Sequence, residues 1–402
     1  MSREVATAAM LALVAAELAL YYAIRSSEKV RNALSKFKVS AEPGAILLEI
    51  GKGVNPRSAS RSLRYLLLLA STASTVFSIY LFYSTVLSYV ADLLLSVARG
   101  RPAPQSPLVP VIPGITLGFE ILPPLLVSIG VGLVVHEFSH LIAAILNNVP
   151  VEGWGVGVLL IFPIAFVKVE EGAFSKSSLT VKASVLGAGI LANLAVGLLS
   201  LLAVSILTQP LAGMLEGPYM VVVGVDSDMP AGRSGMKYPA ILLEINGSKI
   251  QSLDELREAL NKSLDSRAVF KIKTIPVETS VCGYYQKSGR YEEYLVVRDT
   301  LDVERYGYRI GIVVVPEAYI FSSTTPSYLL YTECQLRFLY IVNVSLAIVN
   351  SAPIIITDGG KLLTEILRKL KAQEVDKLVQ WTTVAITALT VFMGLWHSLS
   401  GI

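Results

Sequence analysis

Six apolar segments, each long enough to cross a bilayer, constrain the fold of this chain more than any other feature. A helix of about 20 apolar residues matches the hydrocarbon thickness of a membrane, where no water can satisfy an irregular backbone. The composition agrees, since 53% of the residues are hydrophobic and 16% are charged, whereas soluble domains carry about 25% charged residues. We therefore predict a polytopic α-helical membrane protein with about six transmembrane helices, at residues 6–25, 65–92, 119–147, 181–208, 336–358 and 379–400.

The segment 336–358 differs from the others because Asn350 and Pro353 interrupt it. Proline lacks the backbone donor that continues a helix, so the second half of this segment is predicted to be broken. Irregular backbone at membrane depth is tolerated only inside protein or beside a water-filled cavity. The break is therefore expected to face the interior of the protein.

Two basic loops predict the orientation of the spans. Nine Lys and Arg residues lie between Arg25 and Arg64, against three Glu residues, and a second basic group follows Asp358. Cytoplasmic loops carry such an excess, so we place both loops and residues 148–180 inside. The N-terminus, the loop 99–113 and the polar stretch 210–335 are then outside. The net charge of +3 comes without a basic run that would indicate a nucleic-acid partner.

The third segment contains His136-Glu137-Phe138-Ser139-His140, an HExxH zinc motif. Residues i and i+4 share one face of a helix, so the two His side chains can hold one metal ion. Glu137 would lie beside the metal-bound water as a general base. Ionisable residues are costly in a span, which favours a functional role. The alternative is a chance match in a packed helix.

Two His side chains leave a zinc ion one ligand short, since catalytic sites use three protein ligands. Asp358 is the candidate for the third, because it follows the broken segment and precedes Gly359 and Gly360, which permit unusual backbone angles. The alternative is that Asp358 caps a helix over 361–370. The remaining histidine, His397, is interpreted as an interfacial or packing residue.

Residues 151–171 combine β-branched and aromatic residues with Gly155, Gly157 and Pro163. This composition is typical of strands and is too broken for a spanning helix. We predict a β-hairpin or re-entrant segment next to the metal site, with an ordinary surface hairpin as the alternative. In the first case its edge over 156–168 could pair with an extended substrate by strand addition.

The polar stretch contains local signals of an α/β domain over 219–315. Residues 219–225 and 240–245 read as strands, and Asn246-Gly247 predicts a tight hairpin turn. Ser252 and Glu255 have the spacing of a capping box at the start of a helix.

Four motifs, in matching order and spacing, resemble those of the site-2 protease family of intramembrane zinc metalloproteases. The HExxH matches the first, and residues 189–193 resemble the family's G-P-x-x-N. Residues 350–359 resemble its N-x-x-P-x-P-x-L-D-G, and residues 225–260 resemble the PDZ domain often inserted between the catalytic parts. The chain departs from these patterns at Ile190, Ile355 and Thr357, which affect packing and the bend of the broken helix rather than metal ligands.

The resemblance implies four regions. Residues 1–118 form a two-span membrane region with a cytoplasmic basic loop, and 119–209 form the first part of the catalytic core. Residues 210–335 form an extracytoplasmic PDZ-like domain with an apparent insertion around 275–310, and 336–402 hold the Asp-Gly motif and the last span.

The implied function is proteolysis of transmembrane substrate helices with one catalytic Zn2+, as in regulated intramembrane proteolysis of a membrane-anchored regulator. The PDZ-like domain would exclude bulky ectodomains or bind a peptide or partner. The Gly-, Ala-, Val- and Leu-rich spans fit a multi-pass protein of a prokaryotic plasma membrane.

Two asparagines are candidate substrate-binding residues. Asn350 and Asn193 could hydrogen-bond the substrate backbone or the oxyanion, and the alternative is hydrogen bonding between helices. Gly187 and Gly189 are predicted to permit close helix packing rather than catalysis. Cys282 and Cys334 fall on the predicted outer side, where they form a disulfide or remain two free thiols.

Two other functions compete with the protease. A metal transporter would use intramembrane His and Asp side chains for passage and predicts more than one metal-binding layer. A catalytically inactive scaffold of the same fold predicts the loss of a ligand or of the base, yet His136, Glu137, His140 and Asp358 are all present.

Overall fold

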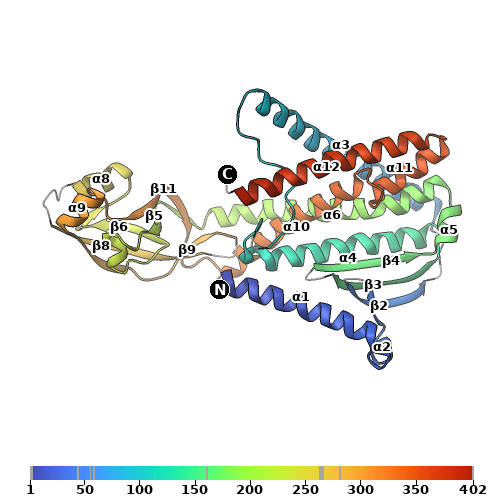
Figure 1. The fold of residues 1–402 in the computed structure, drawn as a ribbon, viewed down its shortest axis with the longest axis horizontal. Coiled ribbons are helices and arrows are strands. Elements are labelled where there is room, and N and C mark those ends of the chain that lie inside the picture. Colours follow the sequence, from blue (N-terminus) through green and yellow to red (C-terminus); the bar gives the residue numbers. More distant parts are fainter. Residues whose placement is uncertain are drawn as a thin grey trace. The chain divides into compact units, whose positions relative to one another are not determined.

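The computed structural model describes residues 3–42, 45–54, 56, 57, 59–113, 115–159, 162–261, 267–279 and 282–400. The chain forms two compact units. The membrane unit comprises the residues up to Ala203 together with Gln335 onward, and the second unit comprises Val204–Cys334. Each unit has its own sheet (Figure 1).

Among the described residues, five helices are long and apolar enough to cross a membrane, and each overlaps a predicted span. They are α3 (Arg61–Ala98), α4 (Leu122–Leu146), α6 (Leu179–Ala212), α10 (Ser327–Ser351) and α12 (Gln373–Ser400). The remaining predicted span, residues 6–25, corresponds to helix α1 (Arg3–Ser26). Its membrane crossing stays a prediction. A chain with five such helices is a multi-pass membrane protein.

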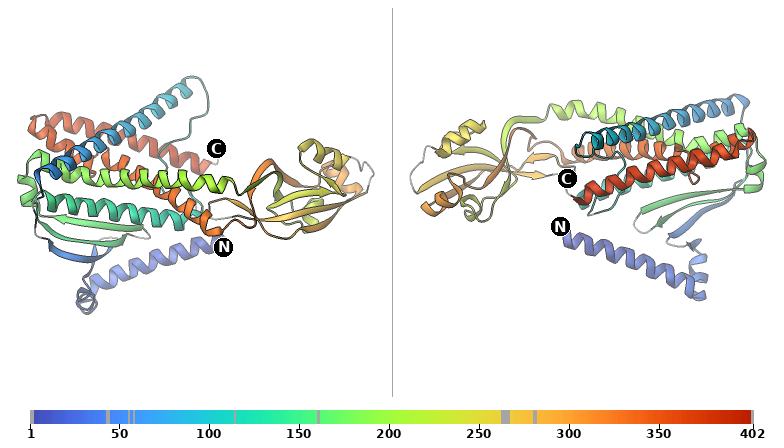
Figure 2. Two further views of the ribbon diagram at one scale, coloured as in Figure 1. Left: turned by 180° about the vertical axis from the view of Figure 1, so that it is seen from behind. Right: turned by 45° about the horizontal axis from the view of Figure 1, so that its top comes forward.

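Helices α3 and α12 lie side by side (Figure 2), and the Tyr83 hydroxyl is 2.7 Å from the Thr383 hydroxyl. The shorter helices of this unit connect the spans: α2 (Glu28–Ser35), the 3-10 turn η1 (Phe119–Ile121), α5 (Glu171–Lys176) and α11 (Asp358–Lys369). Residues 352–357 between α10 and α11 are not helical, which confirms the predicted break at Pro353.

A four-stranded antiparallel sheet packs beside α4 (Figure 1). Its strands, in spatial order, are β1 (Val39–Glu42), β2 (Ala45–Val54), β3 (Val151–Leu159) and β4 (Phe162–Val169). Strands β3 and β4 confirm the hairpin predicted over 151–171, whose tip residues Leu160 and Ile161 lie outside the described residues. The Phe138 ring of α4 meets the Trp154 ring of β3 edge-on at 5.8 Å, which fixes the helix against the sheet.

Strands β1 and β2 lie within the predicted basic loop 25–64, which therefore contains regular structure. Moreover, β2 pairs with β3 along its length, for example Leu48 with Val156, so β3 has a neighbour on each side. The prediction of an open edge across 156–168 is therefore wrong for β3, and on this side of the sheet β4 is the edge strand.

The second unit is built on a seven-stranded sheet whose spatial order is β10-β8-β9-β11-β5-β6-β7. An additional pairing of β8 with β6 closes five of the strands into a ring. The strands are β5 (Leu215–Val225), β6 (Ala240–Ile245), β7 (Ser248–Lys249), β8 (Ala268–Thr279), β9 (Tyr285–Lys287), β10 (Glu292–Arg298) and β11 (Ile312–Phe321), and the helices are α7 (Pro230–Arg233), α8 (Leu253–Asn261) and α9 (Thr300–Tyr306).

Several local predictions in this unit are confirmed. Asn246 and Gly247 have positive φ values of 53° and 81°, as the turn between β6 and β7 requires. The backbone N–H of Glu255 donates to Ser252 Oγ at 3.2 Å, and Glu255 Oε2 accepts from the Ser252 N–H at 3.2 Å. The apparent insertion is part of the sheet, because β10 pairs with β8. Cys282 and Cys334 form a disulfide, the first of the two alternatives.

Candidate metal centre

Three buried side chains from two helices converge on one point. His136 and His140 lie on successive turns of α4, and Asp358 is the first residue of α11. Asp358 Oδ2 lies 3.0 Å from His136 Nε2 and 3.2 Å from His140 Nε2. The two Nε2 atoms are 3.1 Å apart. The structure therefore brings together the three residues that the sequence proposed as ligands.

The tautomer of His140 follows from its second ring nitrogen. His140 Nδ1 lies 2.7 Å from the Val185 carbonyl oxygen of α6. A carbonyl can only accept, so Nδ1 carries the proton and donates. The neutral ring then has its lone pair on Nε2, facing the other two groups, which is the form that binds a metal ion.

The corresponding contact of His136 is made by Asn193 of α6. Its Nδ2 lies 3.1 Å from His136 Nδ1, while its own Oδ1 is buried without a hydrogen-bond partner in the described part of the chain. An Asn amide can turn by half a rotation with little change in shape. In the turned orientation Oδ1 accepts the Nδ1–H of His136, the orphaned oxygen gains a partner, and the Nε2 lone pair is free for a ligand bond.

The donor set fits a zinc ion. Two imidazole nitrogens and a carboxylate oxygen are zinc ligands, and bonds of about 2.0 Å at tetrahedral angles would separate the donor atoms by about 3.3 Å. Three lone-pair atoms at 3.0–3.2 Å repel one another unless a cation lies between them. A proton can form a hydrogen bond between only two of these atoms, whereas a metal ion can bind all three.

Asp358 is free to serve as a ligand because Thr357 caps α11. Thr357 Oγ1 accepts a hydrogen bond from the Gly360 N–H at 3.1 Å. The alternative interpretation of Asp358 as the helix cap is therefore wrong. A Cβ on Gly359 or Gly360 would overlap the carbonyl oxygen of Ser351 or Ile354, respectively. The two glycines thus allow α11 to begin directly against the end of α10.

Gly189 leaves room for the His136 ring. A Cβ at Gly189 of α6 would lie 2.6 Å from both ring nitrogens of His136. At Gly187, a Cβ would lie 2.9 Å from the Ser71 Cβ of α3. Both glycines thus permit close packing, as the sequence predicted, and Gly189 lets the imidazole lie against the helix backbone.

Glu137 follows the first ligand and is half-buried. Its carboxylate interacts with the backbone N–H of Val167 in β4. The candidate base therefore interacts with both the candidate ligands and the edge strand. Asn350 lies half-buried in the last turn of α10, and its role with a substrate stays a prediction.

A buried ion pair near the centre was not anticipated from the sequence. Lys182, near the start of α6, donates to Glu365 Oε2 of α11 at 2.7 Å and has a side chain that is 6% exposed. The pair ties α6 to the helix that carries Asp358. A lysine inside an otherwise apolar segment was the available signal.

The comparison with known protein families agrees with this geometry. A model of peptidase family M50 matches residues 124–393. The match runs from the start of α4 into α12 and includes the three converging candidate ligands and Glu137. The chain therefore belongs to peptidase family M50, the site-2 protease family of membrane metalloproteases.

Proposed function

We propose that this chain is a zinc-dependent intramembrane endopeptidase that cleaves transmembrane helices of other proteins, and that it acts in regulated intramembrane proteolysis of a membrane-anchored regulator. One observation carries the proposal. A half-buried carboxylate, Glu137, lies next to three converging ligand atoms within the apolar helices of a multi-pass membrane protein. Such a cluster is costly in a membrane without a function.

The ligand residues are His136, His140 and Asp358, each through one atom. Zinc held there supplies a Lewis acid that polarises the scissile carbonyl and makes water a stronger nucleophile. Glu137 accepts a proton as the water oxygen attacks the carbonyl carbon. It then delivers the proton to the amide nitrogen as the C–N bond breaks. The Val185 carbonyl holds His140 in the required tautomer, and Asn193 would do the same for His136 with its amide turned so that Oδ1 accepts the Nδ1–H.

A transmembrane substrate helix must unwind locally before cleavage, because its amides are hydrogen-bonded within the helix. Strand β4 offers an edge for the unwound segment, and the Val167 backbone places this edge beside Glu137. Strand addition would then hold the substrate backbone extended at the base. Asn350, at the end of α10, is proposed to hydrogen-bond the same backbone. Asn193 already contacts His136, so its proposed substrate contact is secondary to this one.

The second unit is proposed to be an extracytoplasmic PDZ-like domain that excludes bulky substrates or binds a peptide end. The positive-inside bias supports this orientation, since three spans, an odd number, separate the basic residues 25–64 from residues 210–335 and so put them on opposite sides of the membrane. A prokaryotic plasma membrane remains the proposed location.

The test is to measure zinc per chain and cleavage of a membrane-reconstituted transmembrane substrate in three proteins. The wild type should hold one zinc ion and cleave. Glu137→Gln should keep the zinc and lose about 10²- to 10⁴-fold in cleavage rate, the usual contribution of a general base. Asp358→Ala should lose both zinc and cleavage.

Each competing function has its own outcome in this experiment. A wild type without zinc after metal reloading would indicate the inactive scaffold. Zinc transport into vesicles without peptide cleavage would indicate the transporter, although His136, His140 and Asp358 form the one such cluster found among the described residues. Full zinc in Asp358→Ala would remove Asp358 from the ligand set, and cleavage by Glu137→Gln would remove Glu137 from its role.

A further inference from the structure

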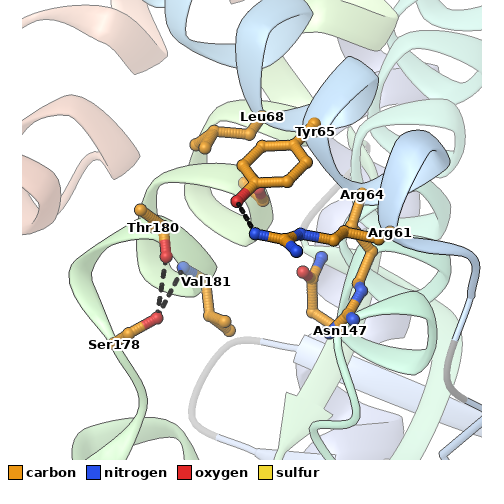
Figure 3. A pocket seen from close by; sticks show the side chains of 9 residues that line it. Arg61, Arg64, Tyr65, Leu68, Asn147, Ser178, Thr180 and Val181 are labelled. Atoms are coloured by element: carbon orange, nitrogen blue, oxygen red, sulfur yellow. Dashed lines mark hydrogen bonds between the residues drawn. The ribbon is translucent and has the colours of Figure 1, made fainter.

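A pocket of about 230 Å³ lies among the membrane helices and is lined by none of the residues of the metal centre (Figure 3). Its walls are the first turns of α3, the end of α4, and the connection from α5 into α6. Nine residues line it: Arg61, Arg64, Tyr65, Leu68, Asn147, Ser178, Thr180, Val181 and Ser184.

The local structure fixes two arginines on one wall. Ser60 caps α3 by accepting from the Leu63 N–H at 3.3 Å, and the Ala59 N–H donates to the Leu146 carbonyl at the end of α4. Arg61 and Arg64 are three residues apart, so they share a face of α3. That face lines the pocket together with Asn147 and the start of α6 (Figure 3).

The positive charge of the pocket is not balanced by its walls. Among the described residues, the nine that line it include no Asp or Glu. Arg61 contacts a neutral group, the Tyr65 hydroxyl, at 3.3 Å. Arg64 Nε is buried and has no hydrogen-bond partner in the described part of the chain. Because no carboxylate lies on the walls, an external acceptor can pair with the guanidinium groups of the two arginines.

The remaining polar groups specify the acceptor. The hydroxyls of Ser178 and Thr180, 2.8 Å apart, lie opposite the arginines across the opening (Figure 3). Two guanidinium groups and two hydroxyls supply more donors, from more directions, than the two oxygens of a carboxylate can accept. A phosphate has additional oxygens, and arginine forks match its geometry. The start of α6 adds the positive end of a helix dipole.

We propose that Arg61, Arg64, Ser178 and Thr180 bind a phosphate group. Two sources share this chemistry, an acidic phospholipid head group and free phosphate. The surroundings favour the lipid, because Tyr65 and Leu68 extend the wall along a membrane-spanning helix, where they can contact a glycerol and acyl chain. The site lies on the side that the basic loops assign to the cytoplasm, where acidic lipids attract Lys and Arg.

The experiment titrates the purified full-length protein in detergent with short-chain phosphatidylglycerol, short-chain phosphatidylcholine or inorganic phosphate, and follows the unfolding temperature. The test variant is Arg61→Gln/Arg64→Gln. Arg57→Gln is the control, because it removes a charge from the same connection at an exposed residue that does not line the pocket. Arg64→Gln alone replaces the double variant if that protein does not fold.

We expect saturable stabilisation of the wild type by phosphatidylglycerol, weaker stabilisation by phosphatidylcholine, and an apparent affinity for phosphatidylglycerol that falls roughly 10- to 100-fold in the double variant. The control should bind like the wild type. Saturation by inorganic phosphate that blocks the lipid effect would identify free phosphate as the ligand. Equal lipid and phosphate responses in the wild type and the double variant would overturn the site.

Discussion

The two units of this protein treat buried polar groups in different ways. In the membrane unit, His136, His140, Asn193 and Asp358 are buried and all meet at one centre. In the second unit, each buried charge has a separate local partner. Asp302, for example, accepts from Arg233 at 2.6 Å.

The electrostatics of Asp302 illustrate this local compensation. Burial acts to raise the pKa of its carboxyl group, but the hydrogen bond and charge of Arg233 and the hydrogen bonds with Asp299 together outweigh it and hold the pKa below the ordinary value. The same carboxylate accepts from the Asp299 N–H at 3.0 Å and completes a capping box at α9. The charge therefore stabilises a helix end, and no chemistry needs to be invoked.

The contrast follows from how each unit gains its stability. The second unit can bury a charge wherever one good partner is available, because its stability comes from an apolar core such as Met220, Leu242, Phe270 and Ile272. A membrane unit is apolar inside and out, so a polar cluster there adds no hydrophobic stabilisation and persists for function. Substitutions at the polar residues that meet at this centre should therefore change metal binding, and substitutions in the second unit should change its stability alone.

The largest effect on the metal centre is expected from a substitution at Gly189. In Gly189→Ala the new methyl group would overlap the His136 ring, and a displacement of about 1 Å at a reacting centre can cost about 10²-fold in rate. We expect zinc to be lost and cleavage to fall by at least this factor. Zinc content by atomic absorption and the cleavage rate are the measurements.

Gly197→Ala is the matched control, because it adds the same methyl group to the same helix. Its Cβ would meet the Val344 side chain, with Cγ2 at 2.7 Å, and a side chain can rotate where a metal ligand cannot. Zinc should stay near one ion per chain in this variant. Equal zinc loss in both variants would mean that zinc binding depends on the packing of α6 in general rather than on the space that Gly189 leaves for His136.

A smaller effect, confined to the second unit, is expected from the disulfide. Cys282 and Cys334 are 52 residues apart, and a crosslink closing a loop of this length stabilises by about 4 kcal/mol in the chain-entropy account. Cys282→Ser/Cys334→Ser should lower the stability of Val204–Cys334, measured as faster amide hydrogen exchange in β5, β6 and β8. Zinc content should not change. Zinc loss in this variant would contradict the proposed difference between the units, because the stability of the second unit would then affect metal binding in the first.

Features with local causes were predictable from the sequence. Ligands at i and i+4, the capping box of Ser252 and the turn at Asn246 each depend on residues within one or two turns of each other. The spans were predictable because hydropathy is set by the membrane and not by tertiary contacts. Together they identified the membrane architecture, the hairpin and the three residues that converge as candidate ligands.

Features that depend on distant partners were not predictable in the same way. Strand β2 was hidden because its partner β3 lies far along the chain and because the basic residues around it suggested a loop. Thr357 and Asp358 are both good caps, and the choice between them depends on how α11 meets the end of α10. The contact of Asn193 with His136 joins residues 57 positions apart.

The smallest effect that we predict tests the orientation of the Asn193 amide. If its oxygen accepts the His136 Nδ1–H, Asn193→Ala removes this support and should weaken zinc binding by about 10- to 100-fold, the usual effect of losing a partner behind a metal ligand. Asn193→Asp keeps an acceptor at this position and should bind zinc more tightly than Asn193→Ala.

Competition with a zinc chelator measures these affinities. Asn343→Ala, at the fully buried asparagine of α10 whose amide donates to the Leu339 carbonyl, is the control and should bind zinc like the wild type. If Asn193 instead donated to Nδ1, a carboxylate there would repel the ring nitrogen, and Asn193→Asp would be the weakest binder of the set. The ranking of Asp against Ala at this one position therefore decides which tautomer of His136 faces the metal.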